Sequence, residues 1–207
     1  MRLNTSRLRC MIGWLGMMLP WIVVILIHYF PQSISATWYT NACTVFMIIL
    51  GSAGLLLISY KGYETVDDIT LTVSGIAGIG ICLFPCHVEG IDGKVGTFLI
   101  DAYVSNIIHC VCAFIFFGLL SYNSMFLFTK TSNDAVLSRN KRIRNIIYRV
   151  CAFGMMTSFL LLLLPNFHIK VWLVETIALF FFGISWLTKA NKYSWLFCDK
   201  KEINDEI

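Results

Sequence analysis

Six long apolar runs, separated by short polar segments, constrain the fold of this chain more than any other feature. A helix needs about 20 predominantly apolar residues to cross the hydrocarbon core of a bilayer. We therefore predict that each run forms a membrane-spanning helix. The predicted spans cover about residues 10–30, 42–60, 69–84, 98–128, 146–164 and 171–187.

The composition agrees with a membrane protein, because 57% of the residues are hydrophobic and only 14% are charged. A soluble domain of this length would need far more charge to cover its surface. The first apolar run is longer than the core of a typical secretory signal, so we interpret it as a retained span. The prediction is an all-α fold, a polytopic bundle of six transmembrane helices that forms a single domain over residues 1–207.

The basic residues indicate the orientation of these spans. Fourteen of the sixteen Lys and Arg residues lie before the first span, around the second and fourth connections, or after the sixth span. Lys94 and Lys170 are the two that fall on the other side. Cytoplasmic segments of membrane proteins are enriched in Lys and Arg. We therefore predict a multi-pass protein of the cell membrane with both termini in the cytoplasm. The basic residues follow no nucleic-acid-binding motif, so nucleic acid is not a predicted partner.

Three polar residues recur every four positions in the fourth predicted span, namely Asp101, Ser105 and His109. This spacing places them in one stripe along a helix, with His109 about 12 Å below Asp101. Glu175 enters the sixth span from the same outer side. Ionisable groups in an apolar span are costly and usually face a protein interior or a wet cavity. We predict an outward-facing ligand pocket lined by these four residues. The competing interpretation is that they are helix-end residues and hydrogen-bonded pairs that fix helix register.

No catalytic residue, metal ligand or cofactor is predicted. A metal site needs several converging ligands, and the sequence contains no His-x-x-x-His pair that would supply two of them from one helix. Ser105, His109 and Asp101 have the residue types of a nucleophilic triad. However, side chains on one rigid helix seldom reach triad geometry, and no nucleophile elbow is present.

Glycines are frequent in the second and third predicted spans, at Gly51, Gly54, Gly75, Gly78 and Gly80. Small residues allow close contact between membrane helices. We expect these two spans to pack tightly, and the same glycine-rich faces could join copies of the chain into a homo-oligomer.

The eight cysteines match no zinc or haem spacing. Cys43 and Cys86 are both expected near the outer surface, where one disulfide could join them. The sequence leaves the state of this pair open.

Five stretches carry a resemblance to known membrane proteins, at residues 34–40, 58–63, 83–85, 126–130 and 183–187. Together they resemble small six-span prokaryotic proteins of the kind classed as domain of unknown function 998. The layout is also similar to the eukaryotic DRAM/FRAG family. Both resemblances imply six spans and no known chemistry. Intramembrane metal hydrolases of the ceramidase and adiponectin-receptor type offer another comparison, but they have seven spans and a His-x-x-x-His motif that is absent here.

The function predicted from these features is binding or sensing of a lipid or small amphipathic ligand, with membrane lipids as partners. An intramembrane enzyme or a proton-coupled transporter that uses the same four residues is the first alternative. A structural or assembly partner without a ligand is the second. Transporters commonly contain internal repeats, and none is visible between residues 1–95 and 96–207.

Overall fold

The computed structural model describes residues 5–62, 64–130, 139–162 and 170–190, and this part of the chain is mostly helical. The finding confirms the predicted all-α class. Two short helices accompany the long ones: the 3-10 helix η1 (Ser35–Tyr39) and the π-helix η2 (Asn123–Leu127). The α-helices are α1 (Thr5–Ile27), α2 (Cys43–Ser59), α3 (Thr65–Leu83), α4 (Ala102–Tyr122), α5 (Arg139–Leu161) and α6 (Val171–Lys189).

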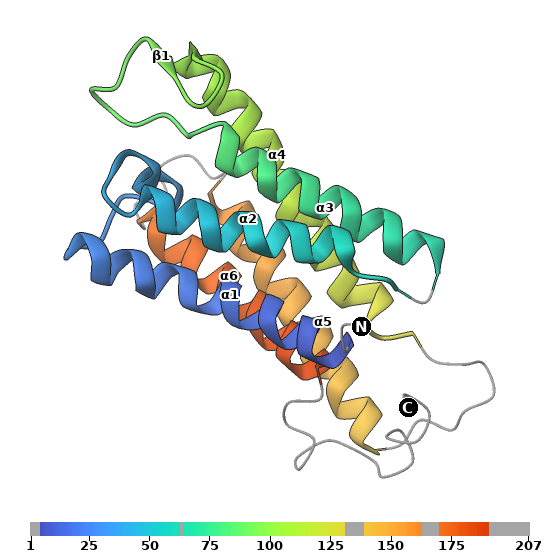
Figure 1. Ribbon diagram of the computed structural model, residues 1–207. Helices are drawn as coiled ribbons and strands as arrows, with labels where there is room; N and C mark the ends of the chain where they lie inside the picture. The colour runs from blue at the N-terminus through green and yellow to red at the C-terminus, as the bar shows by residue number, and fades with distance from the viewer. Residues whose placement is uncertain (1–4, 63, 131–138, 163–169, 191–207) are drawn as a thin grey trace.

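The helices form a closed ring, in which each helix packs against its neighbours in the chain and α6 returns to α1 (Figure 1). Ser6 at the start of α1 donates a hydrogen bond to the carbonyl oxygen of Ala190 after α6 (2.6 Å). The side chain of Lys130 after η2 binds Glu64 before α3 (2.8 Å), and the carbonyl oxygen of Lys130 accepts a hydrogen bond from Lys141 Nζ of α5 (3.1 Å). One end of the ring therefore collects the starts of α1, α3 and α5 and the ends of α2, α4 and α6. We call it the Arg9 end, and the opposite end, which carries η1, the Glu175 end.

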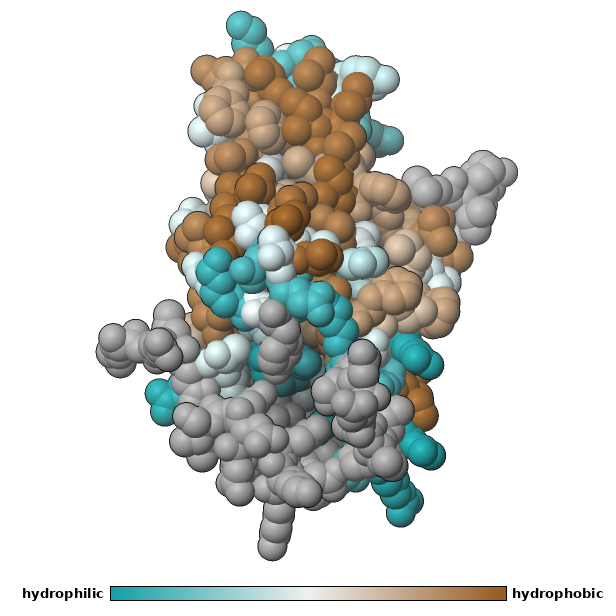
Figure 2. Space-filling view, turned by 90° about the vertical axis from the view of Figure 1, so that its right-hand side faces the viewer, coloured by the Kyte–Doolittle hydropathy of each residue, from teal (hydrophilic) through white to brown (hydrophobic). Residues whose placement is uncertain are grey.

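Four helices in the described part are long and apolar enough to cross a membrane: α1, α3, α4 with η2, and α6. Helix α2 is apolar but has only 17 residues, and α5 begins within the basic segment. Figure 2 shows a broad apolar band on one face, with hydrophilic side chains gathered below it and at the upper tip. These helices support a membrane protein. Residues 163–164 of the fifth predicted span and the tail from residue 191, on which the C-terminal topology depends, lie outside the described residues.

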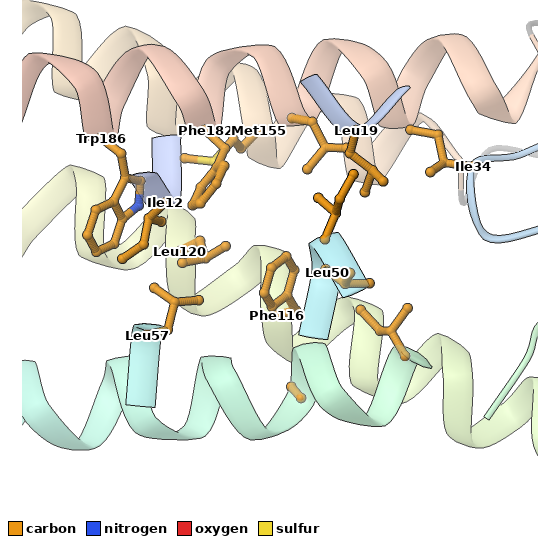
Figure 3. Packing of buried hydrophobic residues seen from close by; sticks show 14 of the residues in the cluster. Ile12, Leu19, Ile34, Leu50, Leu57, Phe116, Leu120, Met155, Phe182 and Trp186 are labelled. Atoms are coloured by element: carbon orange, nitrogen blue, oxygen red, sulfur yellow. The ribbon is translucent and has the colours of Figure 1, made fainter. Parts of the chain in front are cut away.

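The centre of the ring is filled by large apolar side chains from several helices (Figure 3). Phe116 and Leu120 of α4 meet Leu50 and Leu57 of α2 there, and Phe182 of α6 closes the other side. These side chains are almost completely buried. Interiors packed in this way hold the helices in one arrangement, because a change in the volume of any side chain disturbs its neighbours.

Two pairs of helices approach each other through glycines. A Cβ atom on Gly54 would lie 2.8 Å from the carbonyl oxygen of Gly75, so α2 and α3 are in backbone contact. A Cβ on Gly183 would lie 2.9 Å from the carbonyl oxygen of Gly13, which gives α1 and α6 a similar crossing. The glycines at 54 and 75 are thus used within one chain, as expected for spans two and three.

A short hairpin precedes α4 at the Glu175 end. Strand β1 (Lys94–Val95) pairs antiparallel with β2 (Ile100–Asp101). Gly93 and Gly96 adopt positive φ angles of 91° and 76°, which glycine adopts at little cost. Helix α4 consequently begins at Ala102, four residues after the start of the predicted apolar run. Strands this short have no alternating pattern, so the sequence did not predict them.

Candidate functional site

Asp101, the first residue of the predicted stripe, caps its own helix. Its Oδ1 atom accepts hydrogen bonds from the backbone N–H groups of Tyr103 (2.9 Å) and Val104 (3.4 Å). The side chain is exposed. An aspartate in this position satisfies N–H groups that have no partner within the helix. Asp101 therefore determines where α4 begins.

Ser105 and His109 are buried on α4, and both face the chain that follows α3. Ser105 Oγ donates a hydrogen bond to the carbonyl oxygen of Pro85 (2.8 Å). His109 Nδ1 lies 2.8 Å from the carbonyl oxygen of Phe84, and because a carbonyl only accepts, Nδ1 carries the proton. The two side chains satisfy backbone groups left open where α3 ends, and they join α3 to α4.

Glu175 lies half-buried on α6 and faces η1. Its Oε2 atom accepts a hydrogen bond from the backbone N–H of Ile34, 141 residues away in the sequence. The structure thus brings Ser105 and His109 together at the end of α3, while Asp101 and Glu175 have separate partners. All four residues therefore make hydrogen bonds within the protein, as the interpretation of helix-end residues and register-fixing pairs expects.

A cavity of about 60 Å³ lies inside the ring at the Glu175 end. A water molecule needs roughly 10–15 Å³ by this measure, so the cavity has room for a few waters and not for a lipid. Glu175 is the one ionisable residue among its described lining residues, and Asp101, Ser105 and His109 do not line it. All six helices and η1 contribute to its wall, through Leu19, Ile34, Ser35, Phe46, Leu50, Ile81, Ala113, Phe116, Phe117, Phe159, Leu162, Glu175 and Leu179.

A much larger groove of about 560 Å³ runs along the outside of α1. Its walls are apolar apart from Arg7, which is exposed at the Arg9 end. The groove continues from Arg7 as far as Ile22, and Ile49 of α2 forms part of one wall. The remaining lining residues are Cys10, Met11, Trp14, Leu15 and Met18.

A polar network at the Arg9 end was not predicted from the sequence. Arg9 is buried, and its Nε donates to the hydroxyl oxygen of Tyr60 (2.9 Å) while Nη1 donates to the carbonyl oxygen of Lys189 (3.3 Å). Lys130 binds Glu64 (2.8 Å) and the buried Asp67 (2.9 Å). These hydrogen bonds, above all the one with Glu64, raise the pKa of Lys130 above its usual value. From the sequence, Arg9 and Lys130 served only as markers of orientation. The carboxylate partners of Lys130 lie in the charged turn at residues 61–68, whereas the partners of Arg9 lie outside it, at Tyr60 and Lys189.

The cysteines and other potential ligands form no metal site among the described residues. Cys43 and Cys86 are both free thiols. Burial is the main reason that the pKa of the Cys86 thiol rises to about 12, so it remains protonated at neutral pH.

The ring contains, within the described ranges, four helices both long and apolar enough to cross a bilayer, which supports the class of α-helical integral membrane proteins. Comparison with protein-family models, curated proteins and solved structures yields no match to this chain.

Proposed function

We propose that this is a six-span protein of the cell membrane that binds an anionic phospholipid along α1, with both termini in the cytoplasm. Alternation of the helix directions supports six spans, because it requires α2 and α5 to cross alongside the four helices that are both long and apolar enough to do so. Basic residues gather at the Arg9 end, whereas Lys94 lies in the hairpin at the opposite end. The positive-inside rule then assigns the Arg9 end to the cytoplasm. Six spans are also what the family resemblance implies.

Protease sites in two connections test this orientation. A site inserted after Gly90 is expected to be cut on intact cells, because this turn lies at the Glu175 end and a Cβ there would meet nothing within 4 Å. A matched site between residues 131 and 138 is expected to be cut only after the membrane is permeabilised. Immunoblots of tagged protein measure both. Cleavage in the reverse order would contradict the orientation.

The proposed lipid ligand rests on one observation, the groove along α1. Its volume of about 560 Å³ falls within the range of roughly 300–1,000 Å³ that small-molecule sites occupy. The 16 residues from Arg7 to Ile22 extend over about 22 Å, because each step along a helix rises 1.5 Å. This length exceeds half of the hydrocarbon core, which is about 30 Å thick, so an acyl chain of the cytoplasmic leaflet can lie along it.

Arg7, at one end of the groove, favours a lipid with a negatively charged head group. The guanidinium group binds phosphate through paired hydrogen bonds, and basic residues at the cytoplasmic surface attract anionic lipids. The predicted ligand class, a lipid or amphipathic molecule, is therefore retained. The binding site proposed here is the groove along α1 and not the predicted pocket at the Glu175 end, because the cavity beside Glu175 is too small for a lipid chain.

Filling the groove is expected to remove bound lipid. In the variant Met18→Trp a larger side chain occupies the groove, so we expect at least a tenfold loss of phosphatidylglycerol retained in native mass spectra. Arg7→Gln is expected to reduce the preference for phosphatidylglycerol over phosphatidylcholine while leaving some chain binding.

Ile25→Trp serves as the matched control, since Ile25 is on the same helix, is 68% exposed and lies outside the groove. It should retain as much lipid as the unmodified protein. Equal retention by all four proteins would indicate only a general lipid shell and would overturn the proposed site.

A further inference from the structure

The end of α4 changes from an α-helix to the π-helix η2 at Asn123. The backbone N–H of Phe128 donates to the carbonyl oxygen of Asn123 (2.9 Å), five residues earlier in the chain. π-Helical turns are rare and are frequent at functional sites. The π-turn therefore makes the surroundings of Asn123 a candidate binding site.

The side chain of Asn123 is only 1% exposed, and its Nδ2 atom has no hydrogen-bond partner among the described residues. A buried N–H group without a partner is destabilising, so nearly all such groups in proteins are paired with protein atoms or ordered water. No atom of the described residues accepts a hydrogen bond from Nδ2, and ordered water is the usual partner of such a buried group.

Asn123 lines a small cavity of about 10 Å³ at the Arg9 end. Asp67, at 4% exposure, lines the same cavity. One oxygen of Asp67 accepts from Lys130 (2.9 Å) and the other from the backbone N–H of Glu64 (3.3 Å). A carboxylate oxygen can accept more than one hydrogen bond, so a carboxylate that already has partners can also accept from a water molecule. The other lining residues are Tyr60, Gly62, Leu71, Leu127, Phe128 and Lys189.

We infer that this cavity binds one water molecule, which accepts a hydrogen bond from Asn123 Nδ2 and donates one to the carboxylate of Asp67. The volume is about that needed for a single water. Water also fits the chemistry, because it is the smallest molecule that both accepts and donates. A cation would face Lys189, and an anion would face the buried carboxylate of Asp67. The bound water joins the end of α4 to the start of α3 and holds the π-turn in place.

The variant Asn123→Leu tests this site, because a water-filled cavity and an empty one predict opposite changes in the midpoint of thermal unfolding. If water is bound, leucine removes one of its partners, and the midpoint of thermal unfolding is expected to fall by several degrees. If the cavity is dry, leucine removes a buried unpaired amide, and the midpoint rises. A rise would overturn the inference.

Asn145→Leu in α5 is the matched control. Its buried Oδ1 atom has no hydrogen-bond partner in the part of the chain that the structure describes, and Asn145 does not line this cavity, so its replacement is expected to raise the midpoint. A second measurement does not depend on any variant. A density map of the unmodified protein at a resolution of about 2 Å should show a water within hydrogen-bonding distance of Nδ2, as is usual for buried polar groups. A map without that density would also overturn the inference.

Discussion

Replacing Gly75 with valine is expected to lower the thermal unfolding midpoint of the detergent-solubilised protein by roughly 5–10 °C. A Cβ atom at this position would overlap the carbonyl oxygen of Gly54 and would lie 2.6 Å from Cγ1 of Ile58. Because the nearest atom, the carbonyl oxygen of Gly54, belongs to the backbone of α2, the two helices α2 and α3 must separate to admit the side chain. Overpacking of a core costs about 1–3 kcal/mol, and a displaced helix pair belongs at the upper end of that range.

The matched control is Gly51→Val, on α2 one turn before Gly54. A Cβ at Gly51 would meet nothing within 4 Å, so the fold should accept valine with little change. Scanning fluorimetry compares the two variants. Similar losses in both would contradict the backbone contact. Gly51 also tests the proposed homo-oligomer, because a glycine face used between chains would lose its association in this variant while the monomer stays folded.

Replacing Arg9 with methionine is expected to reduce the free energy of unfolding by about 1.5–3 kcal/mol, the usual contribution of a hydrogen bond to a charged group. Arg9 connects α1 to Tyr60 after α2 and to Lys189 of α6, and its guanidinium carbon lies 5.6 Å from the centre of the Tyr60 ring. Methionine matches the aliphatic stem but removes all these contacts. Tyr60 then loses a donor in a buried position.

Urea titration followed by tryptophan fluorescence measures this change, because the buried Trp186 packs against the ring of Tyr60. Arg142→Met is the control, since Arg142 is exposed near the start of α5. Its effect on stability should be close to zero, as is usual at exposed sites. If Arg9→Met behaved like the control, the Arg9 network would have no structural role.

The positions of the helices could be predicted from the sequence because few backbone conformations are stable in lipid. Backbone groups in a membrane must be satisfied within the segment, so an apolar run of sufficient length becomes a helix. The exact boundaries depended on local bonds that composition does not reveal. Asp101 is an example: it lies inside the predicted fourth span, yet it ends the hairpin and caps α4.

The partners of the polar residues were not predictable in the same way. A spacing of four residues shows that Ser105 and His109 share one side of α4, but not which part of the protein that side meets. Their partners are the carbonyl groups after α3, and the partner of Glu175 is the backbone of Ile34. Arg9 likewise bonds to Tyr60, 51 residues away.

Hydrophobicity and charge act on each segment separately, so the sequence was sufficient to predict a helical membrane protein. It could not show which side chains meet, since hydrogen bonds and cavities need atoms from several helices in one place. The groove along α1 and the cavity beside Asn123 are products of that assembly.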